Sequence, residues 1–202
     1  MSGEQKAVPA PASPLATRLR AALSFEFGQL RLRLMLVTLL ARPLPSGSFG
    51  EQRAELLRLL GCAVGPGVRV LGMPSLSGGE APLAPNLSIG AGSLMDVGCV
   101  LELGDKLTIG EDVRIGREAL ILTTTHDLGP KEHRAGPLVR KPVTIGRGAI
   151  VGARAVILPG VTIGEGAHLL ASSVLGKDMP PGSRWGGVPA KPLPAEPVSV
   201  RR

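Results

Sequence analysis

The stretch Val151–Asp178, VGARAVILPGVTIGEGAHLLASSVLGKD, places a branched apolar residue at every sixth position. These leading residues are Val151, Ile157, Ile163, Leu169 and Leu175. A helix repeats about every 3.6 residues and a simple strand about every two, so neither element explains a step of six. A second set of small or slim side chains stands four positions after the leading residues, beginning with that of Ile145: Ala149, Ala155, Val161, Ala167 and Ser173. One short strand and one turn per hexad, with three hexads closing a triangular coil, explain both sets.

The step of six extends from Val64 through most of the remaining chain. Hexads start at Val64 and Val70 and become irregular in the Gly- and Pro-rich stretch 75–85. They resume at Ile89 and, apart from a short irregularity at GDKLT, continue until a non-repeating segment at about 127–142 interrupts them. We therefore predict a mainly β fold, a parallel β-helix over 61–192 with an extruded loop at about 127–142.

The composition supports a repeat fold, and the segments before and after the repeats are predicted to differ from it. Aromatic residues make up only 2% of the chain although 44% of its residues are hydrophobic, so aliphatic side chains must fill the core in thin layers. We predict a disordered tail at 1–14, a helical segment at 15–60 and a C-terminal tail at 193–202. Within the helical segment, one helix lies inside 15–41 and another spans 51–60, with Ser48 as its N-cap and Gly61 as its stop.

The 202-residue chain is basic, with a formal net charge of +7 and a pI of about 10.2. Such a surplus suits nucleic acid, anionic lipid or a phosphorylated cofactor. We expect no nucleic acid, because no recognised binding motif is present and almost no aromatic side chain is available to stack on bases. The sequence leaves open whether the basic N-terminal helix packs on the rest of the protein, on a neighbouring subunit, or on a membrane as a peripheral contact.

The cysteines and the N-terminus bear on the compartment. Cys62 and Cys99 stand among apolar residues and make no disulfide framework, so we expect two buried thiols. Pro9, Pro11 and Pro14 interrupt the N-terminus before any apolar run, and the apolar run at 34–40 is too short to cross a bilayer. These features predict a cytoplasmic location, with membrane association as the alternative.

Three further motifs accompany the hexads: TTTHD at 123–127, LPGVTIGEGA at 158–167 and GVPAKPL at 187–193. With them, the chain from about residue 59 to 192 resembles the hexapeptide-repeat acyltransferases, and most of all the galactoside, maltose and colanic-acid-type O-acetyltransferases. The resemblance implies a left-handed parallel β-helix with a short N-terminal α-helical segment. It also implies a homotrimer with active sites between neighbouring subunits, and transfer of an acetyl group from acetyl-CoA to a sugar hydroxyl.

His126 is the candidate general base. Acyl transfer to a sugar hydroxyl needs a base because the hydroxyl is un-ionised at pH 7, and an imidazole accepts protons near neutrality. On its own a histidine in a loop is usually a polar surface residue, and the TTTHD motif of the resemblance is what favours a function. The expected mechanism is direct transfer, without a covalent enzyme intermediate.

The resemblance assigns further residues to the two substrates. It implies that the backbones of Ala153 and Ala171 contact the pantetheine arm of CoA and that Lys177 and Lys191 lie near its phosphates. Asp96 and Asp105 are the candidate acceptor-binding residues, where Asp96 replaces a family Asn and Asp105 is displaced by one position. Ile150 stands where many relatives have Trp, which leaves the acceptor open.

Several other functions can be compared with the sequence. A zinc carbonic anhydrase needs three spaced His ligands, and His126, His133 and His168 are spaced seven and 35 apart, so we expect no metal. The first 60 residues lack the Gly-rich phosphate loop of a sugar-nucleotide uridylyltransferase. The sequence leaves open an acyltransferase with another acyl donor or an amine or natural-product acceptor, and a non-catalytic β-helical assembly protein.

Overall fold

A computed structural model describes residues 32–41, 43–78 and 83–194 of the chain. The predicted tail at 1–14, the first half of the predicted helix within 15–41 and the residues after 194 lie outside this range. Two α-helices, α2 (Leu32–Ala41) and α3 (Gly50–Leu59), precede the strands, and a short 3-10 helix, η1 (Ala84–Asn86), lies after the first coil. Neither α2 nor α3 is long enough to cross a membrane.

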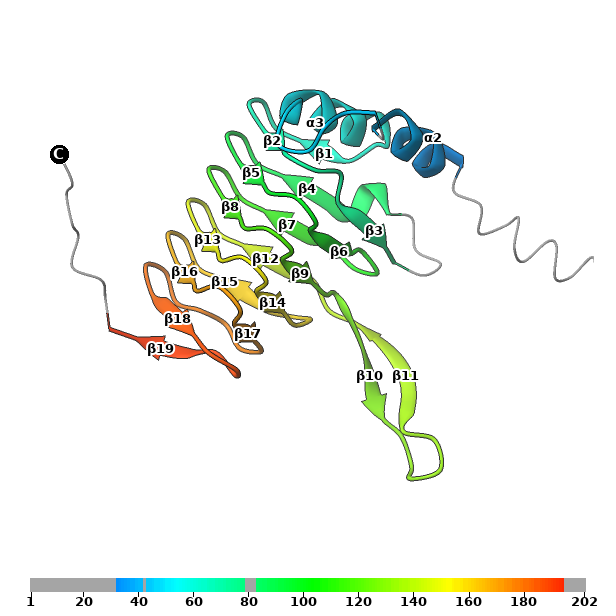
Figure 1. The fold of residues 1–202 in the computed structure, drawn as a ribbon. Helices are drawn as coiled ribbons and strands as arrows, with labels where there is room; N and C mark the ends of the chain where they lie inside the picture. The colour runs from blue at the N-terminus through cyan, green and yellow to red at the C-terminus, as the bar shows by residue number, and fades with distance from the viewer. Residues whose placement is uncertain (1–31, 42, 79–82, 195–202) are drawn as a thin grey trace, which may run out of the picture. The chain divides into compact units, whose positions relative to one another are not determined.

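The strands form a triangular prism with one parallel sheet on each side (Figure 1). Sheet A consists of β1 (Ala63–Val64), β4 (Leu87–Ile89), β7 (Leu107–Ile109), β12 (Val143–Ile145) and β15 (Thr162–Ile163). Sheet B consists of β2 (Arg69–Val70), β5 (Leu94–Met95), β8 (Arg114–Ile115), β13 (Ile150–Val151), β16 (His168–Leu169), β18 (Arg184–Gly186) and the antiparallel β19 (Lys191–Leu193). Sheet C consists of β3 (Ser75–Ser77), β6 (Val100–Glu102), β9 (Leu120–Ile121), β14 (Val156–Ile157) and β17 (Val174–Leu175).

The hexad pattern sets both the register of the sheets and the core. Ile145 pairs with Ile109 in the coil before it and with Ile163 in the coil after it, so leading residues stack in columns inside the prism. All three are at most 2% exposed, and the small residue Ala149 is fully buried beside them. Gly152 shows how closely the coils approach, since a Cβ there would lie 2.3 Å from the backbone nitrogen of Ala171. The predicted parallel β-helix is therefore confirmed.

Three local expectations were wrong. The step of six does not become irregular at Ser75, because Leu76 continues the series in β3 and the break comes only after Ser77. The segment expected as a loop at about 127–142 is a β-hairpin that starts at Thr124, because its β-branched residues pair with a returning strand. Ser48 is not an N-cap: Phe49 occupies that position in a left-handed conformation and no side chain caps α3.

The side chains that point outward from the strands differ in chemistry between the three sides of the prism. Sheet A presents hydroxyl side chains in register: Ser88, Thr108, Thr144 and Thr162. Sheet B presents a largely basic series in register: Arg69, Leu94, Arg114, Ile150, His168 and Arg184. Sheet C presents half-buried aliphatic side chains in register: Val100, Leu120, Val156 and Val174. We call these four residues the aliphatic face.

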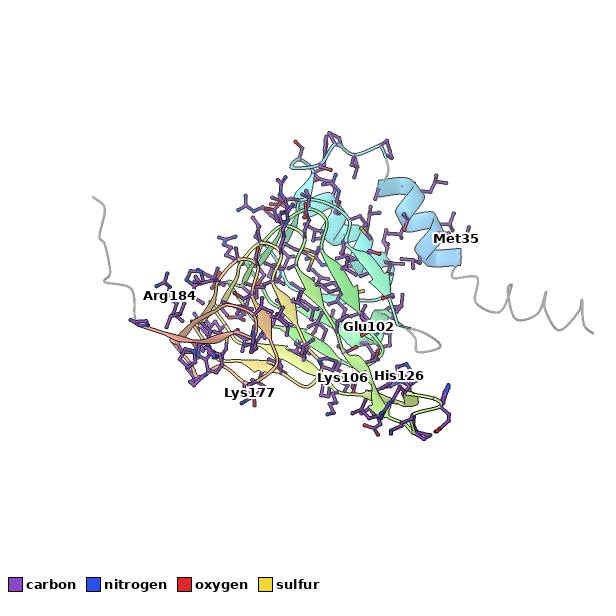
Figure 2. All side chains as sticks on the ribbon, turned by 60° about the horizontal axis from the view of Figure 1, so that its bottom comes forward. Met35, Glu102, Lys106, His126, Lys177 and Arg184 are labelled. Atoms are coloured by element: carbon purple, nitrogen blue, oxygen red, sulfur yellow. The ribbon has the colours of Figure 1, made fainter. Side chains whose placement is uncertain are left out.

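Each helix places one side on the core of the prism. In α2, Val37 and Ala41 are buried. Met35, labelled in Figure 2, is 55% exposed, and the side chains of Leu36, Leu39 and Leu40 are exposed as well. In α3, Ala54 and Leu57 are buried, and Gly61 ends the helix with a positive φ as expected. Packing on the rest of the protein is thus confirmed for the described part of the N-terminal helix.

The guanidinium of Arg53 fixes α3 and the segment before it to the first coil. Arg53 is only 2% exposed, and its Nη2 donates to the carbonyls of Leu44 and Pro45 at 2.7 and 2.8 Å. Its Nη1 donates to the carbonyl of Leu71 at 3.1 Å, and to those of Ser48 and Val70. The buried charge is therefore satisfied by backbone carbonyls of the loop and of the coil.

We expect Arg53→Met to lower the free energy of unfolding by about 2–4 kcal/mol, because buried carbonyls lose their donor while the volume is kept. Urea unfolding at matched protein concentration measures the change. Arg147→Met is the control, since Arg147 is exposed, and it should change the free energy by less than about 0.5 kcal/mol. Equal stability of the two variants would contradict a structural role for Arg53.

Candidate active site

His126 lies on the β-hairpin formed by β10 (Thr124–Leu128) and β11 (Ala135–Arg140), which projects from the prism (Figures 1 and 2). Its side chain is exposed, and Nδ1 lies 2.7 Å from the carbonyl oxygen of Gly136. A carbonyl oxygen only accepts, so Nδ1 must donate the proton in this hydrogen bond. The neutral imidazole therefore has its lone pair on Nε2, where it is available to accept a proton from a substrate.

Glycines in the hairpin make this arrangement possible. A Cβ on Gly136 would lie 2.7 Å from the carbonyl oxygen of Asp127, and one on Gly129 would lie 2.2 Å from that of His133. The pairing register shifts between His126 and Leu128, as in a β-bulge. Bulges redirect side chains near functional sites, and this one lies directly beside the histidine.

The root of the hairpin lies at the corner between sheets C and A, which we call the C/A corner. Asp105 lies at this corner one coil earlier, and its backbone N–H donates to Oγ1 of Thr123 at 3.0 Å. Its carboxylate accepts from the backbone N–H of Lys106 at 2.7 Å, as in a turn. Asp105 and His126 thus belong to the same corner of the chain.

Glu102 also lies at the root and is a residue that the sequence reasoning missed. It follows the inward Leu101, at the position that Leu122 and Leu158 occupy after Ile121 and Ile157. The signal available in the sequence was a carboxylate at a position where two equivalent hexads have leucine. Its carboxylate accepts hydrogen bonds from Thr123 and Thr124 at the start of the hairpin.

Three of the other candidate residues, Asp96, Ala153 and Ala171, lie at the corner between sheets B and C, the B/C corner. Ala153 and Ala171 occupy the same turn position in successive coils, and the carbonyl of Ala153 accepts from the N–H of Ser172 at 2.8 Å. Asp96 lies at this corner with its carboxylate 3.9 Å from Arg117 and 2.7 Å from the backbone nitrogen of Val97. Asp96 therefore lies at the same corner as the two alanines but two and three coils away from them, and sheet C separates this corner from the root of the hairpin that bears His126.

The two lysines lie elsewhere. Lys177 is exposed in the turn after β17, at the C/A corner, and Figure 2 shows it far along the prism from His126. Lys191 is exposed on β19, which pairs with β18 at the end of sheet B. Within a single chain, Lys177 therefore lies at a different corner from Ala153 and Ala171.

Comparison with known proteins agrees with this architecture. The family model described as bacterial transferase hexapeptide (six repeats) matches residues 142–177. Nodulation protein L of Rhizobium meliloti is 42% identical over 106 residues, which are 52% of this chain and 58% of that protein. The chain thus spans little more than half the length of this curated relative.

Two solved structures match over most of their length. A hexapeptide-repeat acetyltransferase of Vibrio cholerae complexed with acetyl coenzyme A is 28% identical, with a TM-score of 0.70 over 84% of this chain and 88% of that one. A galactoside acetyltransferase in complex with coenzyme A is 25% identical, with a TM-score of 0.71 over 91% and 92% of the two chains. The chain thus resembles the hexapeptide-repeat acetyltransferases in the motif at 142–177 and in its fold. Its fold is the parallel β-helix expected from the hexads, with the left hand that the resemblance implied.

Ile150 and Trp185 both lie on sheet B. Ile150, where the resemblance expects Trp, is 42% exposed and pairs with Arg114 and His168 in the basic series of sheet B. Trp185 pairs with Leu169 in the last coil and packs against the core. Trp185 therefore covers the C-terminal end of the column of leading residues.

Apart from His126, the described residues offer neither a reactive cysteine nor a cluster of metal ligands. Cys62 and Cys99 are buried free thiols, as expected, and burial raises the pKa of each to about 11. Neither is therefore a thiolate nucleophile at neutral pH. Within residues 32–41, 43–78 and 83–194, no three His, Cys, Asp or Glu side chains are grouped as metal ligands.

A groove of about 670 Å³ lies between α3 and the first coil. Its charged side chains are Glu51, Glu55 and Arg58. Arg58 already pairs with Glu55 and donates to the carbonyl of Val64 at 2.9 Å. The groove contains none of the candidate residues.

Proposed function

We propose that the protein transfers an acetyl group from acetyl-CoA to a hydroxyl of a sugar or glycosylated acceptor. The observation that supports this most directly is the hydrogen bond from Nδ1 of His126 to Gly136, which leaves Nε2 free as a base. The donor is supported by the solved relatives, which were complexed with acetyl coenzyme A and coenzyme A. The sugar acceptor is supported by the galactoside acetyltransferase among them.

The proposed reaction is a direct transfer. Nε2 of His126 removes the proton of the acceptor hydroxyl while the oxygen attacks the thioester carbonyl, and the carbonyl of Gly136 stabilises the imidazolium. Backbone N–H groups stabilise the oxyanion of the tetrahedral intermediate. The C–S bond then breaks, and the protonated His126 returns the proton to the CoA thiolate.

The active protein is proposed to be a homotrimer. Three prisms around a threefold axis, each turning its aliphatic face inward, bury side chains that one chain leaves half exposed. Because sheet C has the C/A corner on one edge and the B/C corner on the other, this packing sets each C/A corner against the neighbour's B/C corner. The hairpin bearing His126 then meets Ala153 and Ala171 of the next subunit, so each active site is shared.

The cofactor contacts follow from the same packing. The backbones of Ala153 and Ala171 are expected to lie along the pantetheine arm, where small side chains let a ligand approach the coil. Lys177 and Lys191 are expected to pair with the CoA phosphates as point charges. Asp96 and Asp105, which approach one another only across two subunits, are the proposed acceptor contacts.

Acetyl-CoA-dependent release of free thiol with a panel of sugar and amine acceptors tests the proposal. We expect turnover with a sugar, and mass spectrometry should detect a product heavier by one acetyl group. Turnover with amines alone would move the function to N-acyl transfer. Absence of both turnover and CoA binding would favour a non-catalytic assembly protein.

A further inference from the structure

Glu102 stands out chemically from the surface around it. Its outward neighbours on the side of the hairpin are aliphatic, including Val100, Leu120 and Leu122, whereas Ser77 pairs with it on the other side. A carboxylate on such a surface is costly unless hydrogen bonds satisfy it. Figure 2 labels Glu102 near the root of the hairpin that bears His126.

The carboxylate accepts three hydrogen bonds from the first residues of the hairpin. Oε2 accepts the backbone N–H groups of Thr123 at 3.1 Å and Thr124 at 2.9 Å, and Oε1 accepts the hydroxyl of Thr124 at 2.6 Å. The preceding residue, Leu122, still donates its N–H to Ile157 of the next coil. Glu102 therefore takes over as acceptor at the point where the chain leaves the coil.

Hydrogen bonds of Thr123 connect the first residues of the hairpin to the end of the returning strand. Thr123 is fully buried, its Oγ1 donates to the carbonyl of Glu102 at 2.8 Å, and its own carbonyl accepts from the N–H of Lys141 at 2.8 Å. Gly104 leaves the space for this packing, because a Cβ there would lie 2.2 Å from Cγ2 of Thr124. Both strands of the hairpin are thus fastened beside one carboxylate.

From these contacts we infer that Glu102 is a positioning residue that fixes the direction in which the hairpin leaves the prism and thereby the location of His126. The inference rests on the proposed function of His126. Residues 125–128 are exposed, so the described chain supports the hairpin mainly at its root. His126 lies two residues beyond Thr124, and a displacement of about 1 Å at a reacting group costs on the order of 100-fold in rate.

The geometry requires an acceptor for the two backbone N–H groups and a hydrogen-bonding group beside the hydroxyl of Thr124, and it does not require the negative charge. In Glu102→Gln, the amide oxygen keeps both backbone donors, while the hydroxyl of Thr124 turns to accept from the new NH₂ group. In Glu102→Leu, the side chain matches Leu122 and Leu158 on the same surface but accepts nothing. The pair of variants therefore separates hydrogen bonding from charge and from packing.

The experiment compares the full chain with Glu102→Leu and Glu102→Gln, using Glu111→Leu and Glu111→Gln as matched controls on an exposed turn. Hydrogen exchange is followed at Thr123, Thr124 and the hairpin, and kcat and KM are measured for acetyl-CoA and the acceptor. For Glu102→Leu we expect exchange at these amides to rise at least about tenfold and kcat to fall about 10–100-fold, with KM for acetyl-CoA changed less than about twofold. Glu102→Gln and both controls should stay within about threefold of the parent chain.

Two results would overturn the inference: unchanged exchange and kcat in Glu102→Leu, or equal losses in Glu102→Leu and Glu102→Gln, which would assign the role to charge. If Glu102→Leu does not fold, Thr124→Val, which removes one of the three donors, should raise hairpin exchange and lower kcat by about threefold or more. Exchange is measured without turnover. If the parent chain transfers no acetyl group, the proposed function fails, while the exchange comparison still decides whether Glu102 fastens the hairpin.

Discussion

Replacing His126 with alanine is expected to lower kcat/KM for acetyl transfer by about 10²–10⁴-fold, the usual contribution of a positioned general base. The loss follows from removal of Nε2, the lone pair left free when Nδ1 donates to Gly136. Binding of acetyl-CoA should stay within about twofold, because the proposed cofactor contacts lie at the B/C corner and on the lysines. Steady-state kinetics and calorimetric titration with acetyl-CoA measure the two effects separately.

His133 provides the matched control. It is exposed on the turn of the same hairpin, where its backbone N–H donates to the carbonyl of Pro130 at 3.0 Å. His133→Ala therefore removes an imidazole from the same element without touching the proposed base, and its kcat/KM should change by less than about twofold. Equal losses in the two variants would assign the effect to the hairpin as a whole, and full activity of His126→Ala would refute the mechanism.

If the protein forms the proposed trimer, substituting Val156 with lysine is expected to dissociate it and to abolish acetyl transfer. Val156 lies in the middle of the aliphatic face, in register with Leu120 and Val174. An ammonium buried there without a partner costs about 3 kcal/mol or more, which raises the dissociation constant at least about 100-fold. Light scattering after size-exclusion chromatography gives the oligomeric state, and thiol release gives the activity at the same concentrations.

Thr144→Lys is the control for this substitution. Thr144 occupies the outward position of sheet A between Thr108 and Thr162, so the same charge is added to a hydroxyl-lined side. The variant should remain trimeric and active. A Val156→Lys protein that stays trimeric would exclude sheet C as the subunit interface, and an active monomer would show that the site is complete within one chain.

The repeat was readable from the sequence because each hexad has the same physical task. Ile109, Ile145 and Ile163 stack in one column, so each residue repeats the core contacts of the residue one coil away, which is 18 positions along the chain for Ile145 and Ile163 and 36 for Ile109 and Ile145, where the hairpin intervenes. Small residues such as Ala149 are required wherever a turn brings two coils close together. Periodicity therefore predicted the sheets, the register and the buried residues without knowledge of any distant contact.

The non-repeating parts were less predictable because their structure depends on contacts that no period encodes. Ser48 has the composition of an N-cap, but the loop around it is arranged by the buried Arg53, which comes from the next helix. The segment expected as a loop is a hairpin whose pairing joins Thr124 to Arg140, sixteen residues apart. Such pairings depend on the returning strand, which local composition does not reveal.

The sequence by itself determined the prism, through the step of six, and singled out His126 through the TTTHD motif. Only the tertiary structure decided which tautomer of His126 is present, because the Gly136 carbonyl that selects it comes from the returning strand. Only the tertiary structure separated the candidate residues between two corners on either side of sheet C, since the corner that a turn occupies depends on how three hexads close a coil. The tertiary structure also revealed the role of Glu102. That role depends on the N–H groups that donate to its carboxylate, and these belong to residues about twenty positions further along the chain.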